Sequence, residues 1–504
     1  MDPALEKRLK RQIIGKTHRF LAVMPLGFEQ TLISEFKAIG IVVADEQAGT
    51  AEDYRIVGDG KVEFTSKITE AWKAVAYSRI VNRVLMHIAE FKAENFREFE
   101  KKASEVPWEL YLENRRETRD ERRETRDEKR ETRDERANIH VTCKQSRLYH
   151  SDAIAERLQK VIELSFSKGG RFPLASVSPG NANRTAEEPV EPSATPSAGT
   201  PRNAPSHNVY VNFIDDRCTL WLDLAGEELY KRGHERYVND APLKETIAAA
   251  MLFEATHLNN KQSISLDPST PTLRASAQDD ITPITLFDLM AGSGTFSLEA
   301  AYIANKLIPG ICRDFALKHQ PAFKEATWNY ILRRENSSSV IAQNAESKIL
   351  NIVTSDISER AIAIIKHNVE SGPLASISAA PIAPQFHDFF SYTAKEIAEA
   401  CGDTAPVIVL NPPYGKRLDF DAPKLYTKIG RKLTELAHDL KPQGKTLTVA
   451  ILAPKDDTRD GAKYTCTANL LRKCPALSPE NNPAAKLIVT SHGGLTLNTF
   501  IAKI

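Results

Sequence analysis

Hydrophobic residues in roughly the first 226 positions follow two periods, and together they predict a mixed α+β fold. Residues 19–24 have the composition of a strand, and the apolar residues within 28–39 fall on one face of a helix that ends at Gly40. A second helix carries the apolar residues within 68–76, and its pattern continues to Leu85. Alternation typical of strands returns at residues 139–142, 209–213 and 218–223.

From about residue 227 the pattern changes to strands that alternate with helices. The strands are apolar on both faces, which is typical of a parallel sheet covered by helices on both sides. In such a doubly wound sheet, ligands bind at the carboxyl ends of the strands. The predicted strands are 284–289, 349–355, 407–410 and 446–452; the helices are 243–258, 358–369, 424–440 and one that ends near 303, with a helical excursion at 309–343 and a closing hairpin at 486–490 and 495–501.

Three polar stretches look inserted into this framework. Residues 115–136 repeat a charged seven-residue unit, RRETRDE, that has no apolar position and so cannot form the buried seam of a coiled coil. We expect a solvated helix or disorder there, with an RNA-binding arm as the alternative. Residues 176–206, rich in proline and serine, predict a disordered loop, and residues 259–282 predict a surface excursion.

Composition places the chain among soluble proteins of several domains. Its 504 residues exceed what one hydrophobic core supports, and it has no apolar run of about 18 residues to cross a membrane. Six scattered cysteines without C-x-x-C spacing predict reduced thiols, a cytoplasmic protein and no metal site. The basic first twelve residues precede no apolar segment, so we expect a solvated helical arm, with a nucleic-acid-binding tail as the alternative.

The charge of the chain is balanced, with 67 Lys and Arg against 66 Asp and Glu. The repeat at 115–136 supplies ten of the basic and nine of the acidic residues, which leaves 57 of each elsewhere. Bulk attraction therefore identifies no polyanionic partner. An enzyme that acts on nucleic acid would have to concentrate its cations locally.

The first strand of the predicted sheet runs into a glycine-containing turn, DLMAGSGTF, from Asp288 to Phe296. Gly292 and Gly294 allow positive φ and close approach of a ligand to the backbone, and the following helix, from Thr295, offers free N–H groups. The third glycine of a dinucleotide site is missing, since Ser297 stands there. Asp288 fits a ligand with a cationic amino-acid tail; a structural strand-end cap is the alternative.

Two further acidic residues end predicted strands. Asp356 follows the second strand, where a carboxylate that binds a ribose sits in this architecture. Asp388 lies between Phe386 and Phe389-Phe390, a setting suited to the face and the amino group of an adenine. A loop aspartate that caps a helix is an equally good interpretation of Asp388.

The most specific motif is Asn411-Pro412-Pro413-Tyr414-Gly415, directly after strand 407–410. The two prolines stiffen the turn, so that the Asn411 amide and the Pro412 carbonyl face the end of the sheet as acceptors. Two acceptors can bind the hydrogens of an exocyclic amine on a base and aim its nitrogen at a methyl donor, while Tyr414 stacks on the ring. A purely structural rigid turn is the alternative.

These turns resemble those of the S-adenosylmethionine-dependent methyltransferases that modify exocyclic amines. With the motifs LDLAG, KRGH, APLKE and SHGGL, which begin at residues 222, 231, 241 and 491, the chain is similar to the guanine-N2 methyltransferases that carry a THUMP RNA-binding domain. Within that family it resembles the amino-terminal half of the bacterial large-subunit ribosomal RNA methyltransferases of the K/L type. The second half of the K/L type is absent, so its activity is not implied.

The resemblance implies three domains: a ferredoxin-like segment at 16–70, a THUMP domain at 71–226 with insertions at 115–136 and 176–206, and a Rossmann-like class I methyltransferase domain at 227–504. It implies that Asp288, Gly292, Gly294, Thr295, Asp356 and Asp388 hold S-adenosylmethionine, and that Asn411, Pro412 and Tyr414 hold a guanine. Leu289 and Ala291 stand where relatives often show Pro and Cys, and the charged repeat interrupts the THUMP region after Leu112.

The resemblance also implies 23S ribosomal RNA, or its precursor, as the substrate, with the target guanine flipped out of its stack. The candidates for RNA binding are Arg79, Arg83, Lys231, Arg232, Lys416 and Arg417. An adenine-N6 or a tRNA guanine-N2 methyltransferase is the alternative enzyme, because it would use the same turn. A non-catalytic RNA-binding or ribosome-assembly protein that keeps the fold is the alternative of another class.

Overall fold

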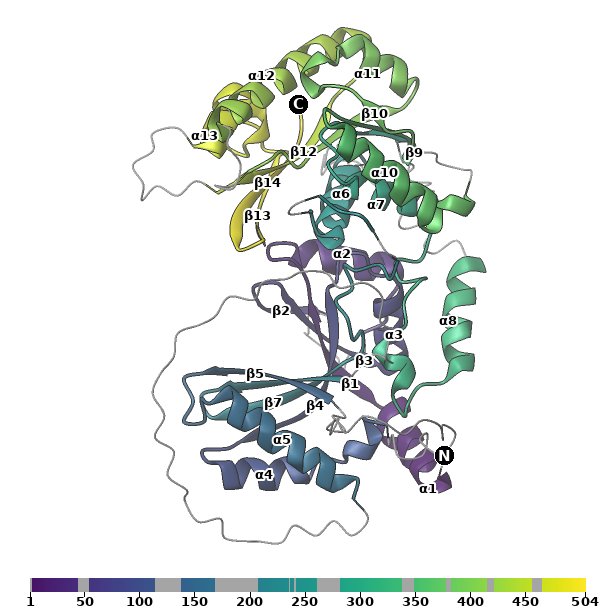
Figure 1. Cartoon of the computed structure of the whole chain (residues 1–504), viewed down its shortest axis with the longest axis vertical. Helices are drawn as coiled ribbons and strands as arrows, with labels where there is room; N and C mark the ends of the chain where they lie inside the picture. Colours follow the sequence, from purple (N-terminus) through teal and green to yellow (C-terminus); the bar gives the residue numbers. More distant parts are fainter. Residues whose placement is uncertain are drawn as a thin grey trace, which may run out of the picture.

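A computed structural model gives the fold of most of the chain. It describes residues 2–43, 54–113, 137–167, 207–234, 236–239, 242–260, 282–337, 349–377, 382–414, 421–455 and 465–504. The predictions for the charged repeat, for residues 176–206, for most of 259–282 and for Gly415, Lys416 and Arg417 lie outside the described residues. Figure 1 shows two sheets arranged along the long axis, with the amino-terminal half below and the second half above.

The amino-terminal half contains one sheet of seven strands, in the order β2–β3–β1–β4–β7–β6–β5. Neighbouring strands are antiparallel except β5 and β6, which are parallel. The sheet joins strands from both predicted amino-terminal segments, and the expected boundary at residue 70 falls inside helix α3. The strands are β1 (Thr17–Val23), β2 (Tyr54–Gly58), β3 (Lys61–Lys67), β4 (Arg83–Lys92), β5 (Ala137–Lys144), β6 (His207–Ile214) and β7 (Arg217–Asp223).

Four helices cover one face of this sheet. They are α2 (Glu29–Ile39), α3 (Ile68–Tyr77), α4 (Phe96–Ser104) and α5 (Ser151–Ser165). Alternate strand residues such as Phe20, Met86 and Val211 point into the same core as Trp72 of α3 and Phe99 of α4. This arrangement follows from the period of two along each strand, which sends every second side chain to the helices.

Helix α3 is shorter than the apolar pattern predicts. It ends at Tyr77, and residues up to Leu85, which were expected to continue it, turn and enter β4. The reason is a tertiary contact: the Ser78 hydroxyl and the Arg79 N–H both donate to the buried carboxylate of Glu35 on α2. The Arg79 N–H is therefore not available for a helical bond.

The amino-terminal arm is not the solvated helix that its charge predicts. It forms α1 (Pro3–Leu9) and a π-helical turn at Lys10–Ile14, and Leu9 and Ile13 are buried in the main core. The Arg8 guanidinium pairs with Glu109 at 2.5 Å. Two buried apolar side chains on one face are enough to hold this short arm against the fold, because the burial of each contributes roughly 1.5–3 kcal/mol.

The second half is a doubly wound sheet in the order β10–β9–β8–β11–β12–β14–β13, in which β14 is antiparallel to its neighbours. The strand order reverses between β8 and β11, which places a ligand site at their carboxyl ends. The strands are β8 (Ile284–Asp288), β9 (Ile349–Asp356), β10 (Gln385–Phe386), β11 (Ala405–Leu410), β12 (Thr448–Pro454), β13 (Lys486–His492) and β14 (Leu495–Lys503).

Helices cover both faces of the second sheet. Leu286 and Val409 share a core with α6 (Glu245–Asn260), α7 (Thr295–Ala304) and α10 (Glu359–Ser371). Their neighbours Phe287 and Leu410 share the other core with α11 (Ala394–Cys401), α12 (Ala422–Leu440) and α13 (Cys466–Lys473). The predicted excursion contains α8 (Glu325–Ser337), which packs on α3. No helix of the described residues is long and apolar enough to cross a membrane.

A buried ion cluster joins the two halves. Glu299 on α7 accepts two bonds from Arg232, at 2.9 and 3.1 Å, and lies 3.6 Å from Arg79 of the amino-terminal half. The Glu299 side chain is fully buried and that of Arg232 is 2% exposed. Burial alone would raise the pKa of Glu299, but Arg232 and Arg79 hold it below its ordinary value. The carboxylate is therefore charged and fully used by its partners.

These contacts change the interpretation of three predicted RNA-binding residues. Arg232 and Arg79 are taken up by the cluster, and Arg79 also donates to the carbonyls of Tyr302 and Leu307. Arg83 pairs with the buried Asp223 at 2.7 Å. The positions of these arginines do not support phosphate binding, because each guanidinium already has a protein partner. The Lys231 side chain is half exposed and pairs with Glu227. Its role in RNA binding stays a prediction.

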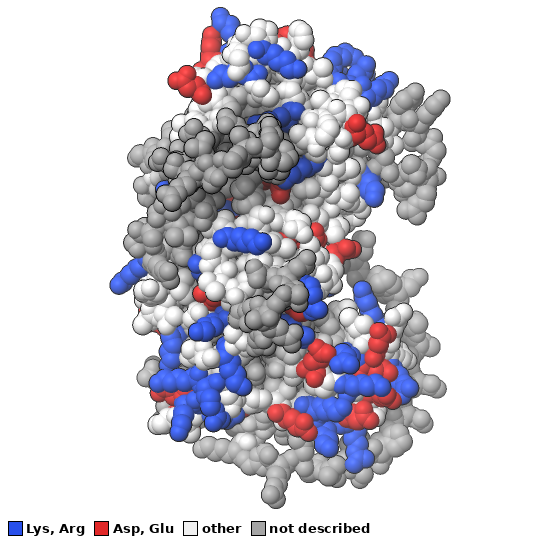
Figure 2. Space-filling model, turned by 180° about the vertical axis from the view of Figure 1, so that it is seen from behind, with Lys and Arg blue, Asp and Glu red and all other residues white. Residues whose placement is uncertain are grey.

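Lys and Arg side chains gather at the lower end of the molecule, which carries the amino-terminal sheet and helices, with Asp and Glu among them (Figure 2). Basic and acidic side chains, which are nearly equal in number over the whole chain, are thus also mixed over much of that surface.

The ion cluster predicts a sharp difference between two neighbouring residues. Arg232→Met should lower the free energy of unfolding by about 3–5 kcal/mol, because it leaves Glu299 buried without its main partner. Lys231→Met should change it by less than about 1 kcal/mol, since its ion pair is exposed. Urea unfolding followed by circular dichroism measures both. Equal losses of stability in the two variants would contradict the structural role of Arg232. A loss of RNA affinity in Arg232→Met without a loss of stability would show that Arg232 binds RNA.

Candidate functional site

The glycine turn opens a space at the end of β8. Gly292 and Gly294 have φ of +56° and +76°, in the region that glycine adopts without strain. A Cβ on Gly294 would lie 2.9 Å from Ile365 of α10, so this position is closed by packing. A Cβ on Gly292 would meet no atom within 4 Å. The backbone at Gly292 therefore borders an opening that a ligand can enter.

Asp288 lies beneath this turn with one carboxylate oxygen unused. Its Oδ2 accepts from the Ser297 N–H at 3.1 Å and the Ser297 hydroxyl at 2.7 Å. Its Oδ1 is buried and has no hydrogen-bond partner among the described residues. Burial raises the pKa of Asp288 to about 7, against the lowering effect of the Ser297 bonds. A buried acceptor of this kind is costly, and a cationic donor would satisfy it.

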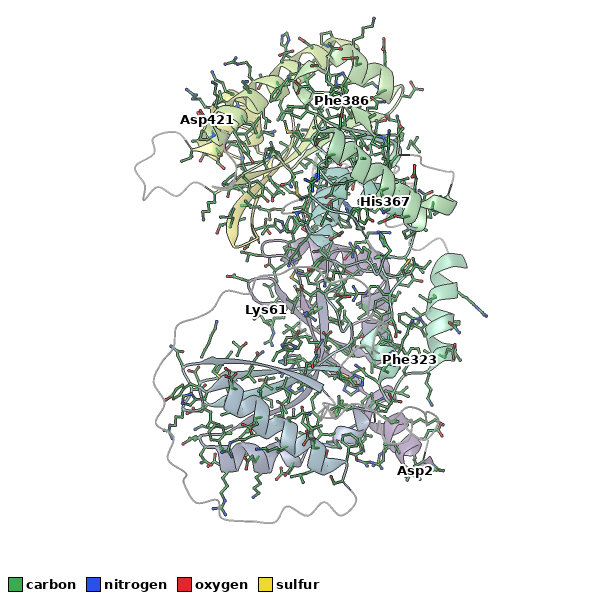
Figure 3. All side chains as sticks on the ribbon, viewed as in Figure 1. Asp2, Lys61, Phe323, His367, Phe386 and Asp421 are labelled. Carbon is green, nitrogen blue, oxygen red and sulfur yellow. The ribbon has the colours of Figure 1, made fainter. Side chains whose placement is uncertain are left out.

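Asp356 ends β9 and holds the glycine turn. Its Oδ2 accepts from the Gly292 N–H at 2.9 Å, and its Oδ1 accepts from the Ser358 N–H at 2.9 Å. The next residue, Ile357, is 67% exposed, and Phe386 of β10, which pairs with Asp356, is 62% exposed (Figure 3). Exposed apolar side chains beside a strand-end carboxylate suit the face of an aromatic ligand. The sequence reasoning missed Ile357, although an apolar residue after a strand-end aspartate was a usable signal.

Asp388 follows β10 and caps a short helix. Its Oδ1 accepts from the Phe390 N–H at 3.0 Å, at the start of a 3-10 helix that spans Phe389–Ser391. The capping interpretation is thus observed. The parallel pairing of β10 with β9 also places Asp388 at the same edge of the sheet as Asp356, so cofactor binding stays a prediction for this residue.

The turn after β11 carries a second unused acceptor. The Oδ1 atom of Asn411 is buried and has no hydrogen-bond partner among the described residues. Pro412 is buried beside it, and Tyr414 is half-buried, which raises the pKa of its phenol to about 12 and keeps it neutral. Asp421 caps α12 beyond residues 415–420 (Figure 3).

The sheet brings these residues to one edge. Strands β9 and β11 both flank β8 in parallel, and Val409 pairs with Asp288, so Asn411 lies just beyond the carboxyl end of β8. Asp288 and Asn411 thus present two unpaired acceptors at neighbouring strand ends. The described residues contain no group of His, Cys, Asp and Glu side chains arranged to hold a metal ion.

A segment before α6 supports the glycine turn from the other side. Arg236 pairs with Glu245 and lies 3.5 Å from the Ser293 carbonyl and 3.4 Å from the Thr295 hydroxyl. Asn368 of α10 binds both the N–H and the carbonyl of Tyr237, at 2.8 and 2.9 Å. The Tyr237 ring stacks on that of His367, which Figure 3 labels on α10. The sequence reasoning missed Arg236 and Asn368, because their partners are distant along the chain.

The carboxyl-terminal hairpin closes the same region. His492 contacts the Pro242 carbonyl at 3.0 Å, which brings the SHGGL motif to the APLKE motif. Two of the motifs that suggested the family from sequence are therefore neighbours in the structure.

Strand order, glycine turn and strand-end polar residues together define the second half as a Rossmann-like methyltransferase domain. A family model described as "RMKL-like, methyltransferase domain" matches residues 276–453. The predicted resemblance to the large-subunit ribosomal RNA methyltransferases of the K/L type is confirmed, and so is the methyltransferase fold.

Two curated relatives show the extent of the likeness. The "Ribosomal RNA large subunit methyltransferase K/L" of Allochromatium vinosum is 26% identical over 425 residues, 83% of this chain and 46% of that protein. The "Putative RNA methyltransferase YpsC" of Bacillus subtilis is 23% identical over 404 residues, 80% of each chain. The present chain spans about half the length of the K/L proteins that it matches.

Two solved structures share the fold over nearly the whole chain. One is SMU.472, a putative methyltransferase complexed with SAH, with a TM-score of 0.61 and 21% identity over 97% of this chain and 98% of the other. The second is a predicted N6-adenine-specific DNA methylase from Listeria monocytogenes, with a TM-score of 0.59 and 20% identity over 96% of each chain.

The raised pKa of Asp288 predicts a gain in stability from its removal. A carboxyl whose pKa is higher in the folded than in the unfolded protein destabilises the fold as pH rises from its ordinary pKa of 3.8 through about 7. Asp288→Asn should therefore raise the free energy of unfolding at pH 8 by up to about 4 kcal/mol, since each pKa unit is worth about 1.4 kcal/mol, and by little at pH 4. Urea unfolding at the two pH values measures this. A loss of stability at pH 8 would show that Asp288 is stabilised by partners beyond Ser297.

Proposed function

We propose that this chain transfers a methyl group from S-adenosylmethionine to the exocyclic N2 amine of a guanine in large-subunit ribosomal RNA. The observation that carries the proposal is the pair of buried, unpartnered acceptors, Asp288 Oδ1 and Asn411 Oδ1, at neighbouring strand ends of a methyltransferase fold. One acceptor suits the cationic end of the cofactor, and the other suits an amine.

The residues around the glycine turn fit S-adenosylmethionine. Asp288 would accept from its ammonium group, and Asp356 would face its ribose. Ile357 offers an exposed apolar surface for the adenine, and the open space beside Gly292 lets the backbone approach the amino-acid tail. The sulfonium of the bound cofactor supplies an activated methyl group. What remains for the protein is to place the acceptor nitrogen in line and to exclude water.

The turn after β11 would place that nitrogen. An exocyclic amine on a guanine is conjugated and poorly nucleophilic. Asn411 Oδ1 and the Pro412 carbonyl would accept its two hydrogens, which stabilises positive charge as it develops and directs the lone pair at the methyl group. Tyr414 would stack on the base. No dedicated general base is required, because the nitrogen loses its proton after the methyl group has been transferred.

The names of the relatives favour RNA as the substrate. The Allochromatium vinosum protein is named for ribosomal RNA of the large subunit and the Bacillus subtilis protein for RNA. The amino-terminal half, which we assign to a ferredoxin-like segment and a THUMP domain, would dock the RNA. Because the N2 amine lies in the minor groove of a duplex, the guanine would be flipped out to reach Asn411.

The Listeria monocytogenes protein, described as a predicted N6-adenine-specific DNA methylase, keeps adenine-N6 as the second candidate, since Asn411 and Pro412 would hold either amine. Mass spectrometry of nucleosides from cells that lack the gene separates the candidates. Loss of N2-methylguanosine from 23S RNA supports the proposal. Loss of N6-methyladenosine with intact N2-methylguanosine, or loss confined to tRNA, contradicts it.

Cofactor binding should depend on pH through Asp288. Because the carboxyl of the free protein is half protonated near pH 7, the affinity for S-adenosylmethionine should rise by about tenfold from pH 6 to pH 8. Calorimetry at several pH values measures this, and Asp288→Asn should bind weakly and without the pH dependence. A wild-type affinity that does not change with pH would contradict contact between Asp288 and the ammonium group.

Asn411→Ala should reduce methyl transfer by a factor of about 10²–10³, because it removes an acceptor that acts as charge develops on the amine. The affinities for RNA and for S-adenosylmethionine should stay within about twofold of the wild type. Transfer of radiolabelled methyl groups under single-turnover conditions measures the chemical step. Undiminished transfer would favour a structural turn, and an inactive wild-type protein that binds RNA would favour the non-catalytic alternative.

A further inference from the structure

We infer that Arg236 is a positioning residue for the cofactor, because its buried guanidinium holds the glycine turn in the shape that binds S-adenosylmethionine. The inference rests on the cofactor of the proposed function, and it gives a role to a residue that lies outside the sequence motifs of the chain. Arg236 acts through Ser293 and Thr295 of the turn and not by touching the ligand.

The Arg236 side chain joins the glycine turn to the start of α6. Its Nη1 pairs with Glu245, the first residue of α6. Its Nη2 donates to the Ser293 carbonyl at 3.5 Å and to the Thr295 hydroxyl at 3.4 Å. The side chains of Arg236 and Glu245 are 7% and 13% exposed, so water competes little for these bonds. A planar guanidinium suits this position, since its donors form a rigid fork that serves two partners at once.

The segment that carries Arg236 is itself fixed. Asn368 of α10, which is 1% exposed, binds both the N–H and the carbonyl of Tyr237, the residue that follows Arg236. The same Asn368 amide donates to the Ser293 carbonyl at 3.5 Å. Arg236 and Asn368 therefore hold one carbonyl of the turn together, from a connecting segment and from a helix.

The N–H groups of the turn show why Ser293 is the residue that has to be held. The N–H groups of Ala291, Gly292 and Gly294 each donate to an oxygen of the protein, at 2.7–3.1 Å. For the Ser293 N–H, no hydrogen bond is found among the described residues. Ser293 thus has a carbonyl that the protein binds and an N–H that is left for a ligand.

The two glycines explain why the turn depends on outside support. Gly292 and Gly294 have no Cβ to restrict their backbone, so the residues between and beside them are free to take other conformations. A turn that is already held in its bound shape loses less conformational entropy when the ligand arrives. The loss of Arg236 should therefore weaken cofactor binding although no contact with the cofactor is removed.

The test is isothermal titration calorimetry of the full chain with S-adenosylmethionine. Arg236→Met should weaken binding at least about tenfold, because the turn loses its link to α6. Arg236→Lys should weaken it only about threefold, since an ammonium keeps the pair with Glu245 but lacks the fork that also reaches the turn.

A second variant separates positioning from the cost of an unpaired charge. Arg236→Met leaves Glu245 buried without its partner, which destabilises the fold. The double variant Arg236→Met with Glu245→Met removes both charges and keeps similar side-chain volumes. It should be more stable than Arg236→Met in urea unfolding, and it should show the same loss of cofactor affinity.

Arg313→Met is the matched control. Arg313 is also 7% exposed and donates to the carbonyls of Glu227, Glu228 and Lys231, none of which belongs to the glycine turn. Its replacement should lower the free energy of unfolding and leave the affinity for S-adenosylmethionine within about twofold of the wild type. A merely structural role of Arg236 predicts instead that cofactor affinity follows stability in every variant.

Two outcomes would overturn the inference: cofactor affinity of the double variant within twofold of the wild type, or an equal loss of affinity in Arg313→Met. Failure of the proposed catalytic function is distinguishable, because it would appear as a wild-type protein that binds S-adenosylmethionine but transfers no methyl group to RNA. That result would leave the role of Arg236 in place. A wild-type protein that does not bind the cofactor would overturn both.

Discussion

The buried carboxylate of Glu299 is the constraint on which the arrangement of the two halves depends. A charge taken so far out of water is tolerated only with close partners, and its partners are Arg232, from the connection between the halves, and Arg79, from the amino-terminal half. Glu299 lies on α7, whose first turn begins at the glycine turn. The requirement to pair one charge therefore holds the amino-terminal half, the connection and the glycine turn together as one unit.

In the candidate site, in contrast to the Glu299 cluster, buried polar groups lack partners. Asp288 and Asn411 each keep a buried side-chain oxygen that has no hydrogen-bond partner among the described residues, and both lie at the end of a strand. An unsatisfied buried acceptor costs about 1–3 kcal/mol, and the raised pKa of Asp288 is one expression of that cost. Two such groups side by side are expected where a ligand supplies the missing donors. Supports such as Asp356, Arg236 and Asn368 keep the surrounding backbone in place while the acceptors stay free.

Much of the second half could be predicted because its signals are local. Strands apolar on both faces, a glycine turn and a proline-stiffened turn each depend on neighbouring residues, and the structure places all three at one sheet edge. The errors have a common cause in distant contacts. Helix α3 ends early because Glu35 binds Ser78 and Arg79, and the charged arm packs because two of its side chains reach the core. Neither contact can be predicted from the local pattern of apolar and polar residues.

The sequence by itself determined the class of fold in the second half and the positions of its turns, since the period of apolar residues and the conformations of glycine and proline act within a few residues. Only the tertiary structure decided what the charges do. Arg79, Arg83 and Arg232 look like phosphate-binding residues in the sequence, but burial beside Glu299 and Asp223 makes them structural. His140 and Tyr210 belong to no motif in the sequence, and their rings stack only because β5 pairs with β6. Burial and strand register are properties of the folded chain. They therefore decide the roles of residues whose local sequence pattern gives no indication of a role.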